Sequence, residues 1–346
     1  MERQTVLLSA ADAQSGQKAI LEAGRILAEG GLVAIPTETV YGLAADATNE
    51  KAVANIFAAK GRPQDNPLIV HISAMEEIYS IVKELPTGLT QLATHFWPGP
   101  LTIICPKSEN IPMVTSGGLD TVAVRMPSHP VARDIIRAAG VPLAAPSANR
   151  SGSPSPTTAQ HCVNDLWGRV EAIVDSGPCD VGVESTVISL CGSVPTLLRP
   201  GAVTLEQLRE VLGEVELGKG VLEQLEEGTK VLSPGLKYKH YAPAAKVVLV
   251  RGNSEAFAQL VQSKANEGVW AMCFTEDKAL LQDIPNLCYG AAEDYAAQAV
   301  HLFDHLRKMD ELGAKEVYIH APKPEGIGLA VYNRLVRSAG FCIVDV

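Results

Sequence analysis

Short apolar runs alternate with segments of helical periodicity along the chain. The apolar run at 32–35 follows two glycines and ends at Pro36, which predicts a buried strand, and the run at 68–72 predicts another. Between them, apolar residues at helical spacing predict a helix over 49–60 that ends at Gly61. The same patterns predict further strands at 101–105, 121–125, 142–145, 172–175, 183–188 and 196–198, and further helices at 17–29, 75–82, 89–96, 129–139, 157–167 and from 205. This part of the chain therefore favours a twisted, mixed α/β sheet covered by helices.

From residue 246 onward, strand and helix alternate more regularly. Strands are expected at 247–250, 269–274, 287–289, 317–320 and 342–344, and helices at 255–265, 293–312 and 329–339. This order predicts a small, parallel-sheet, Rossmann-like α/β domain. A length of 346 residues also favours two domains, because single cores rarely grow beyond roughly 250 residues. We therefore expect a catalytic domain over 1–212, a linker over 213–244 and a second domain over 245–346.

The expected linker contains the segment SPGLKYKHYAP at 233–243. Simple spacers favour Gly, Ser, Pro or Glu, whereas this segment is dense in Tyr, Lys and His. We interpret it as a lid that reaches back to the first domain. A solvated tether is the alternative interpretation.

Polar side chains collect at the ends of the predicted elements in the first domain. Lys60 and Arg62 come at a helix end, His71 lies in a strand, and Arg125 and Arg199 end two other strands. We expect these ends, and the hydroxyl-bearing end of the strand at 32–35, to be adjacent and to form a ligand site at the edge of the sheet. Each residue type also has an ordinary explanation. Cations at a helix end pair with its dipole, a strand histidine packs in the core, and an arginine at a strand end forms a surface ion pair.

Net charge, cysteine content and the lengths of the apolar runs argue against several classes of protein. A net charge of −10 gives no overall field that would attract a nucleic-acid backbone or an anionic membrane. The seven cysteines are scattered without a CxxC pair, which argues against a disulfide framework or a zinc site and fits a reducing compartment. The sequence has no signal-peptide core and no apolar run of membrane length, so we expect a soluble, cytoplasmic protein.

Three catalytic patterns are missing from the sequence. It has no GxxxxGK[ST] loop, no HExxH or Cys/His cluster for a tightly held metal, and no GxSxG elbow for a covalent nucleophile. What remains is a set of hydroxyls, lysines and arginines, to which the segment PSANRSGSPSP at 146–156 contributes. Such a set orients anions and stabilises developing charge without forming a bond to the substrate.

Seven motifs occur along the chain in one order. They are PTETVYGL, AKGRPQDNPLIVHI, TVAVRMP, APSANRSGSPSPT, GVESTV, LLRPG and SPGLKYKHYAP. Together they resemble the long, two-domain form of the threonylcarbamoyl-AMP synthases, within the YrdC-like family, over essentially the whole chain. One departure is DSGPC at 175–179, where a Gly-Gly pair and a Thr are expected for the family. It concerns only a turn.

The resemblance implies a nucleotidyltransferase that makes threonylcarbamoyl-AMP and pyrophosphate from L-threonine, bicarbonate or CO2, and ATP, for the t6A modification of tRNA. It implies that Mg²⁺ arrives with ATP, that no cofactor or metal is tightly held by the protein, and that the product passes to the enzyme that transfers it to tRNA. By motif position, L-threonine is expected at Thr39, His71, Arg125, Ala145 (through its backbone) and Ser185. The nucleotide is expected at Lys60, Arg62, Asn66, Thr121, Ser147, Asn149, Ser155, Arg199, His240 and Tyr241, with Lys60 and Arg62 as the catalytic pair.

Two other functions compete with this interpretation. A double-stranded RNA-binding module could use a concave basic site for a phosphate backbone, but the acidic balance and the lack of interleaved basic and aromatic clusters argue against it. A synthase of a different carbamoyl adenylate would use the same chemistry with another amino acid.

Overall fold

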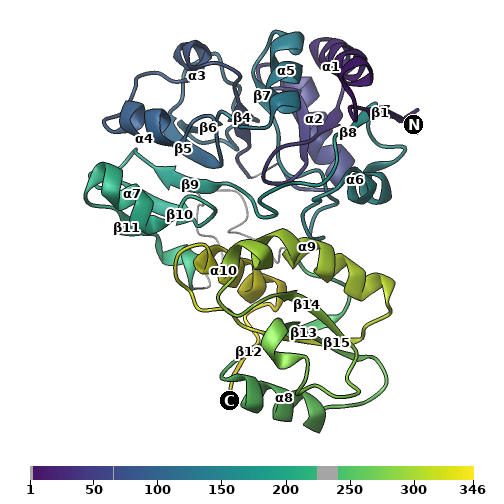
Figure 1. The fold of residues 1–346 in the computed structure, drawn as a ribbon. Helices are drawn as coiled ribbons and strands as arrows, with labels where there is room; N and C mark the ends of the chain where they lie inside the picture. Colours follow the sequence, from purple (N-terminus) through teal and green to yellow (C-terminus); the bar gives the residue numbers. More distant parts are fainter. Residues whose placement is uncertain (1–2, 65, 224–240) are drawn as a thin grey trace. The chain divides into compact units, whose positions relative to one another are not determined.

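The computed structural model describes residues 3–64, 66–223 and 241–346. Within these ranges the chain forms two compact units, one from most of the residues before 224 and one from 241 onward (Figure 1). Most of the segment expected to be a linker falls on residues 224–240, which lie outside the described residues.

The first unit contains an eleven-stranded mixed sheet in the order β1-β8-β2-β3-β7-β4-β6-β5-β9-β10-β11. Its strands are β1 (Val6–Ser9), β2 (Val33–Ile35), β3 (Gly42–Asp46), β4 (Ile69–His71), β5 (Leu101–Pro106), β6 (Thr121–Arg125), β7 (Leu143–Ala144), β8 (Ala172–Asp175), β9 (Thr186–Ser189), β10 (Thr196–Arg199) and β11 (Glu216–Leu217). Its helices are α1 (Ala13–Ala28), α2 (Glu50–Lys60), α3 (Ile78–Ile81), α4 (Leu89–Phe96), α5 (Pro130–Ala139), α6 (Ala159–Leu166) and α7 (Leu205–Leu212), with 3-10 turns at η1 (Met75–Glu77) and η2 (Lys219–Val221). The mixed sheet with helices that the sequence predicts is confirmed.

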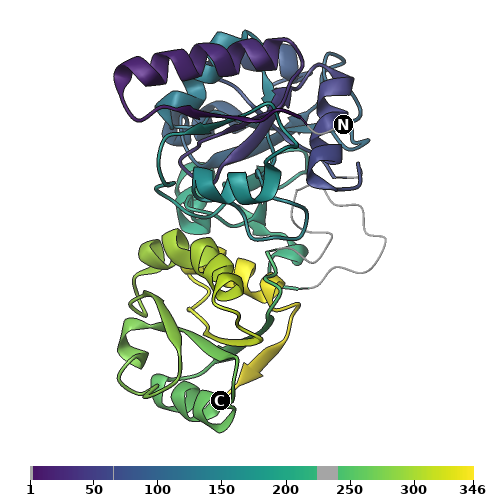
Figure 2. The same ribbon diagram turned by 90° about the vertical axis from the view of Figure 1, so that its right-hand side faces the viewer.

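The sheet buries a different core on each face. Side chains alternate along a strand, so Val33 and Ile35 of β2 pack under α1 and α5, whereas Ala34 between them belongs to the core on the opposite face. That opposite core includes residues of α2, α4, α6 and α7. Figure 1 shows α1 beside α5, and Figure 2 shows α1, the long purple helix, on one side of the strands. The sheet is thus the middle layer of three.

Capping residues define the start of α1 and both ends of α2. The Asp12 side chain caps α1, and the Asn49 side chain accepts hydrogen bonds from two backbone N–H groups at the start of α2. Gly61 ends α2 with a φ of 64°, a left-handed conformation that glycine adopts without strain. As a result α2 stops directly after Lys60.

The second unit is a five-stranded parallel sheet in the order β14-β13-β15-β12-β16. Its elements are β12 (Lys246–Arg251), α8 (Ser254–Ser263), β13 (Val269–Phe274), η3 (Thr275–Asp277), β14 (Asn286–Gly290), α9 (Tyr295–Glu311), β15 (Glu316–His320), α10 (Gly328–Ser338) and β16 (Ile343–Asp345). Figure 1 shows α8 on one side of the sheet and α9 and α10 on the other. Helices on both faces of a parallel sheet are the arrangement that the regular strand–helix alternation predicts.

The structure corrects three expectations about the first unit. The strands predicted at 32–35 and 68–72 are not adjacent, because β3 and β7 lie between β2 and β4. β3 was not predicted, since its residues are small and have low strand propensity; it forms between the antiparallel partners β2 and β7. The helix expected from 205 ends at Leu212, and the residues that follow include an unpredicted strand, β11, which pairs with β10.

Every helix within the described ranges is too short or too polar to cross a lipid bilayer.

Candidate active site

Strand register brings three polar side chains into one row in the first unit. His71 at the end of β4 pairs with Arg125 at the end of β6. On its other side, Arg125 pairs with Thr102 of the antiparallel strand β5. Because paired residues on neighbouring strands point to the same face of a sheet, the three side chains share one face.

This row lies on the face opposite to the larger core. Val70, Val124 and Ile103 alternate with the row and belong to the core that includes α2 and α4. The face of the row carries a smaller apolar cluster made of Ile69, Ile104, Ala123 and Val187. Polar groups are therefore held at the edge of a small apolar patch.

Arg125 makes three buried contacts, one from each guanidinium nitrogen. Nη1 donates a hydrogen bond to Thr39 Oγ1 at 2.9 Å, Nε donates to the carbonyl oxygen of Gly99 at 3.3 Å, and Nη2 lies 2.7 Å from Glu38 Oε1. The side chains of Arg125 and Glu38 are only 4% and 6% exposed, so the alternative of a surface ion pair is wrong. The loop after β2 thus meets the end of β6.

Burial and the neighbouring charges determine which groups of this cluster are ionised. Burial is the largest single influence on Glu38 and raises its pKa, but the positive charge of Arg125 and hydrogen bonds to the carboxylate together outweigh burial, so the pKa lies below its ordinary value. Burial, followed by the nearby charge of Arg125, lowers the pKa of His71 to about 3. Near neutral pH the cluster therefore contains a carboxylate, a guanidinium and a neutral imidazole.

Ser185 connects Thr102 to Arg199. Ser185 Oγ lies 2.7 Å from Thr102 Oγ1 and accepts a hydrogen bond from Arg199 Nη2 at 3.0 Å, while Arg199 Nε donates to the Ser185 carbonyl oxygen at 3.0 Å. All three side chains are buried. A residue expected to bind threonine and one expected to bind the nucleotide are therefore in direct contact.

A second cluster forms where α2 meets the loop after β7. The ammonium group of Lys60 donates hydrogen bonds to the carbonyl oxygen of Ser147 and, at 2.7 Å, to that of Asn149. Ser147 Oγ donates to Asn149 Oδ1 at 2.5 Å. Three of the residues expected at the nucleotide are thereby brought together around one buried cation.

The remaining expected nucleotide residues occupy several places in the first unit. Ser155 Oγ donates a hydrogen bond to Glu184 Oε1 at 2.6 Å, and both residues are buried. Asn66 is fully buried beside Gly117, where φ is 60° and a Cβ atom would lie 2.9 Å from the Asn66 carbonyl carbon. Thr121 begins β6, roughly 13 Å along the strand from Arg125 at about 3.3 Å per residue, so these two are not brought together.

Three other expected residues can be placed only in part. The N–H of Ala145 donates to the Ile69 carbonyl oxygen at 3.0 Å. Arg62 follows Gly61 and its N–H donates to the Phe57 carbonyl oxygen at 3.0 Å. Tyr241 packs on Phe303 of α9 in the second unit, with ring centroids 5.2 Å apart. His240 lies outside the described residues.

Known protein families match residues of both units. A family model described as "Telomere recombination" matches residues 25–201, and one described as "Threonylcarbamoyl-AMP synthase, C-terminal domain" matches residues 203–340. The threonylcarbamoyl-AMP synthase of Pyrococcus abyssi is 43% identical over 348 residues, which cover 99% of this chain and 100% of that protein. The chain belongs to the threonylcarbamoyl-AMP synthase family.

Further relatives of the threonylcarbamoyl-AMP synthase family agree with this placement. The Bacillus subtilis threonylcarbamoyl-AMP synthase is 44% identical over 325 residues, covering 93% of each chain. The crystal structure of P. abyssi Sua5 complexed with L-threonine is similar with a TM-score of 0.90 at 41% identity, covering 99% of each chain. The expected architecture, a YrdC-like mixed sheet and a small Rossmann-like domain, is confirmed.

Sequence reasoning missed two buried partners of the expected site residues. Glu38 lies between two threonines of the PTETVYGL motif, and Thr102 lies in an apolar strand. Glu38 carried a detectable signal, since an acidic residue directly after a buried strand needs a partner. Thr102 carried none, because its role depends on the register between β5 and β6.

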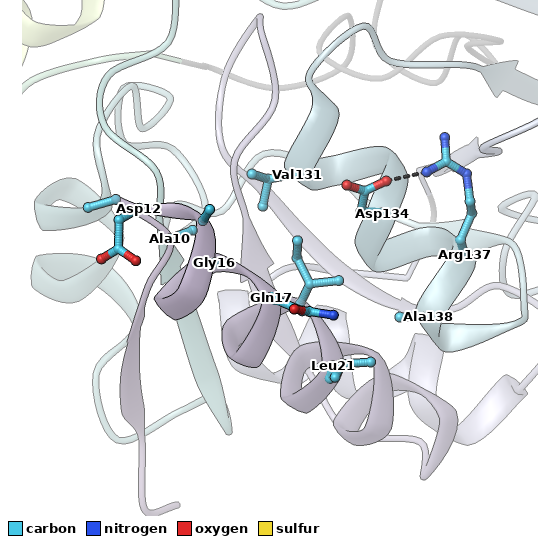
Figure 3. A pocket seen from close by; sticks show the side chains of 12 residues that line it. Ala10, Asp12, Gly16, Gln17, Leu21, Val131, Asp134, Arg137 and Ala138 are labelled. Carbon is cyan, nitrogen blue, oxygen red and sulfur yellow. Dashed lines mark hydrogen bonds and ion pairs between the residues drawn. The ribbon is translucent and has the colours of Figure 1, made fainter.

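The described residues also contain a pocket apart from these clusters. Figure 3 shows it between α1 and α5, where Leu21, Val131 and Ala138 line its apolar side and Asp134 and Arg137 form an ion pair. Its lining includes none of the residues expected to bind threonine or the nucleotide. No group of three His, Cys, Asp or Glu side chains suited to a metal ion occurs in the part of the chain that the structure describes.

Proposed function

We propose that this chain catalyses the formation of threonylcarbamoyl-AMP and pyrophosphate from L-threonine, bicarbonate or CO2, and ATP. The observation that carries the proposal is the match of nearly the whole chain to relatives named threonylcarbamoyl-AMP synthase, at 43% and 44% identity. The L-threonine complex of the P. abyssi structure supports threonine as the amino acid. The product serves the t6A modification of tRNA and passes to a separate transferring enzyme.

Threonine binds at the end of the row on β4 and β6. Arg125 holds its carboxylate, for which a guanidinium is the best-suited side chain. The hydroxyls of Thr39 and Ser185, the imidazole of His71 and the carbonyl oxygen of Ala145 surround the rest of the molecule. The support is geometric: Thr39 and His71 adjoin Arg125 directly, and Ser185 is linked to it through Thr102.

The nucleotide binds along the cationic side of the site. Lys60, Arg62 and Arg199 neutralise phosphate charge, and the charge of Mg²⁺ arrives with ATP as part of the substrate. The nucleotide set is completed by Asn66, Thr121, Ser147, Asn149 and Ser155, with His240 and Tyr241 as a cover. The contacts of Lys60 with the loop that carries Ser147 and Asn149 support a preformed cradle.

The chemistry requires alignment of two anions and no covalent intermediate with the protein. The deprotonated threonine amine attacks CO2 with loss of a proton, or bicarbonate with loss of water, and becomes a carbamate. A carbamate oxygen then forms a bond to the α-phosphorus while the bond from that phosphorus to the bridging oxygen breaks, and pyrophosphate leaves. Lys60 and Arg62 act by balancing the charge that develops on the phosphoryl oxygens.

An omission experiment tests the proposal. Pyrophosphate release is measured with purified full-length protein and with L-threonine, bicarbonate or ATP left out in turn. Release should require all three, and a panel of other amino acids should not replace threonine. Equal nucleotide consumption without an amino acid would overturn the proposal, and equal release with a different amino acid would reassign the substrate.

A further inference from the structure

The pairing of Glu38 with Arg125 needs a functional explanation. Both side chains are almost fully buried, and burying an ion pair is often no more stable than burying apolar groups of the same size. An unpaired arginine would also attract a substrate carboxylate more strongly than one whose charge is already balanced. The carboxylate of Glu38 therefore weakens the attraction of Arg125 for a substrate carboxylate.

The charges of Glu38 and Arg125 balance each other, and the neighbouring His71 does not change that balance. Arg125 carries one positive charge and Glu38 one negative charge, and His71 is neutral because its pKa is lowered to about 3. Burial also lowers the pKa of His129 and raises that of the Cys179 thiol, on which the charges of Glu38 and Asp180 both act. Near neutral pH the charges of Arg125 and Glu38 therefore cancel, and His71 adds none.

A free α-amino acid has the matching charge distribution. It is a zwitterion at neutral pH, with a carboxylate and an ammonium group on the same carbon atom. Nη1 and Nη2 of Arg125 each carry a second N–H beyond the contacts with Thr39 and Glu38, and a carboxylate such as Glu38 can accept about four hydrogen bonds. One side chain can bind the substrate carboxylate while the other binds its ammonium group.

We propose that Glu38 binds the α-amino group of the amino-acid substrate, so that the Glu38–Arg125 pair selects α-amino acids over acids that lack an amine. The inference rests on the proposed function and deepens it, because it adds a specificity-determining residue outside the set expected from the motifs. The nucleotide side differs in charge, since it holds the cations of Lys60, Arg62 and Arg199.

The test compares two ligands in wild type and in Glu38→Gln. The ligands are L-threonine and the acid in which a hydroxyl replaces its amino group, and their dissociation constants are measured by calorimetry. Wild type should bind threonine at least tenfold more tightly than the hydroxy acid. Glu38→Gln should weaken threonine binding at least tenfold and leave the hydroxy acid unchanged or more tightly bound, so that the preference disappears.

Equal weakening of both ligands would overturn the proposal, because it would mean that Glu38 only holds Arg125 in place. Glu50→Gln, which removes a carboxylate from the exposed start of α2, is the matched control and should bind both ligands like wild type. Should Glu38→Gln fail to fold, Glu38→Asp keeps the charge and should keep the preference for the amine; loss of that preference would equally refute the idea.

The wild-type protein separates this inference from the proposed function. Pyrophosphate release that does not depend on threonine would sink the proposed function. Threonine-dependent release together with an unchanged ligand preference in Glu38→Gln would sink only the role of Glu38.

Discussion

Replacing Ser185 with alanine tests whether the hydrogen-bonded chain from Thr102 to Arg199 couples the two substrate sites. The change removes a bond between two neutral hydroxyls at 2.7 Å and a bond from the charged Arg199 at 3.0 Å. A neutral bond contributes about 0.5–1.5 kcal/mol and a charged one about 1.5–3 kcal/mol, so Ser185→Ala should lower the free energy of unfolding by about 2–4.5 kcal/mol. The bond from Arg199 Nε to the backbone of residue 185 remains.

The functional effect should appear as lost coupling between ligands. In wild type, a nonhydrolysable ATP analogue should tighten L-threonine binding, and threonine should tighten binding of the analogue by the same factor, because coupling free energies are reciprocal. In Ser185→Ala we expect this factor to fall at least fivefold. Calorimetric titration of each ligand with and without the other measures it.

A serine at the far end of β9 provides the control. Ser189 is buried there, and its side chain accepts a hydrogen bond from the Cys191 N–H at 3.3 Å and hydrogen-bonds to the Cys191 side chain, so it links no expected site residues. Ser189→Ala should cost less than about 1 kcal/mol and leave the coupling intact. Full coupling in Ser185→Ala, or equal loss in both variants, would refute the assignment of this chain as the link.

Three further predictions concern single side chains. Lys60→Met should abolish pyrophosphate release, whereas Lys51→Met, at an exposed position of the same helix, should leave it normal; turnover near wild type in Lys60→Met would contradict the role of the cation. The pKa of His71 is about 3 in the folded protein and about 6.5 in the unfolded chain, so protons favour unfolding below pH 6.5. Urea unfolding should show wild type losing about 2 kcal/mol more than His71→Gln between pH 7 and pH 5, and parallel pH profiles would disprove this. Gly24→Ala should destabilise the protein by about 1–3 kcal/mol in thermal or urea unfolding, because its Cβ would lie 2.6 Å from a side chain of α5, and threonine affinity should not change. Gly16→Ala, with nothing nearer than 3.8 Å, should be tolerated; equal losses in the two variants would be inconsistent with a steric cause.

Helices and strands could be predicted from the sequence more completely than the order of the strands in the sheet. Strands such as 121–125 were predictable because their apolar runs end at Pro or Gly, and Arg125 was predictable as a strand-end arginine. Its contacts could not be derived from local patterns, since Glu38 and Thr39 reach it across a sheet order that places β3 and β7 between β2 and β4, and Thr102 through the register between β5 and β6. Local patterns carry no information about which strands become neighbours.

The same limit applies to the electrostatics of the site. Sequence reasoning found a set of cations and hydroxyls and inferred a cradle for anions, which fits Lys60 and Arg199. It could not show that Arg125 is balanced by a buried carboxylate or that His71 is neutral, because both depend on burial and on distances between distant segments. The structure therefore separates a charge-balanced cluster around Arg125 from the buried cations Lys60 and Arg199, a difference that the sequence alone did not reveal.

The difference in charge between the Glu38–Arg125 pair and the cations Lys60 and Arg199 favours movement of the reacting group from the first to the second. Free threonine is neutral overall and matches the balanced pair of Glu38 and Arg125. In the proposed reaction its ammonium group loses one proton, and the nitrogen loses a second proton as it takes up CO2, so the net charge of the molecule changes from zero to −2. The new carbamate then lies beside Glu38, and two like charges about 4 Å apart repel by about 4 kcal/mol at an effective dielectric constant near 20. The cations of Lys60 and Arg199 attract the same group. With Glu38 at the amine as proposed, carbamate formation itself drives the new nucleophile away from the amino-acid subsite and toward the α-phosphorus.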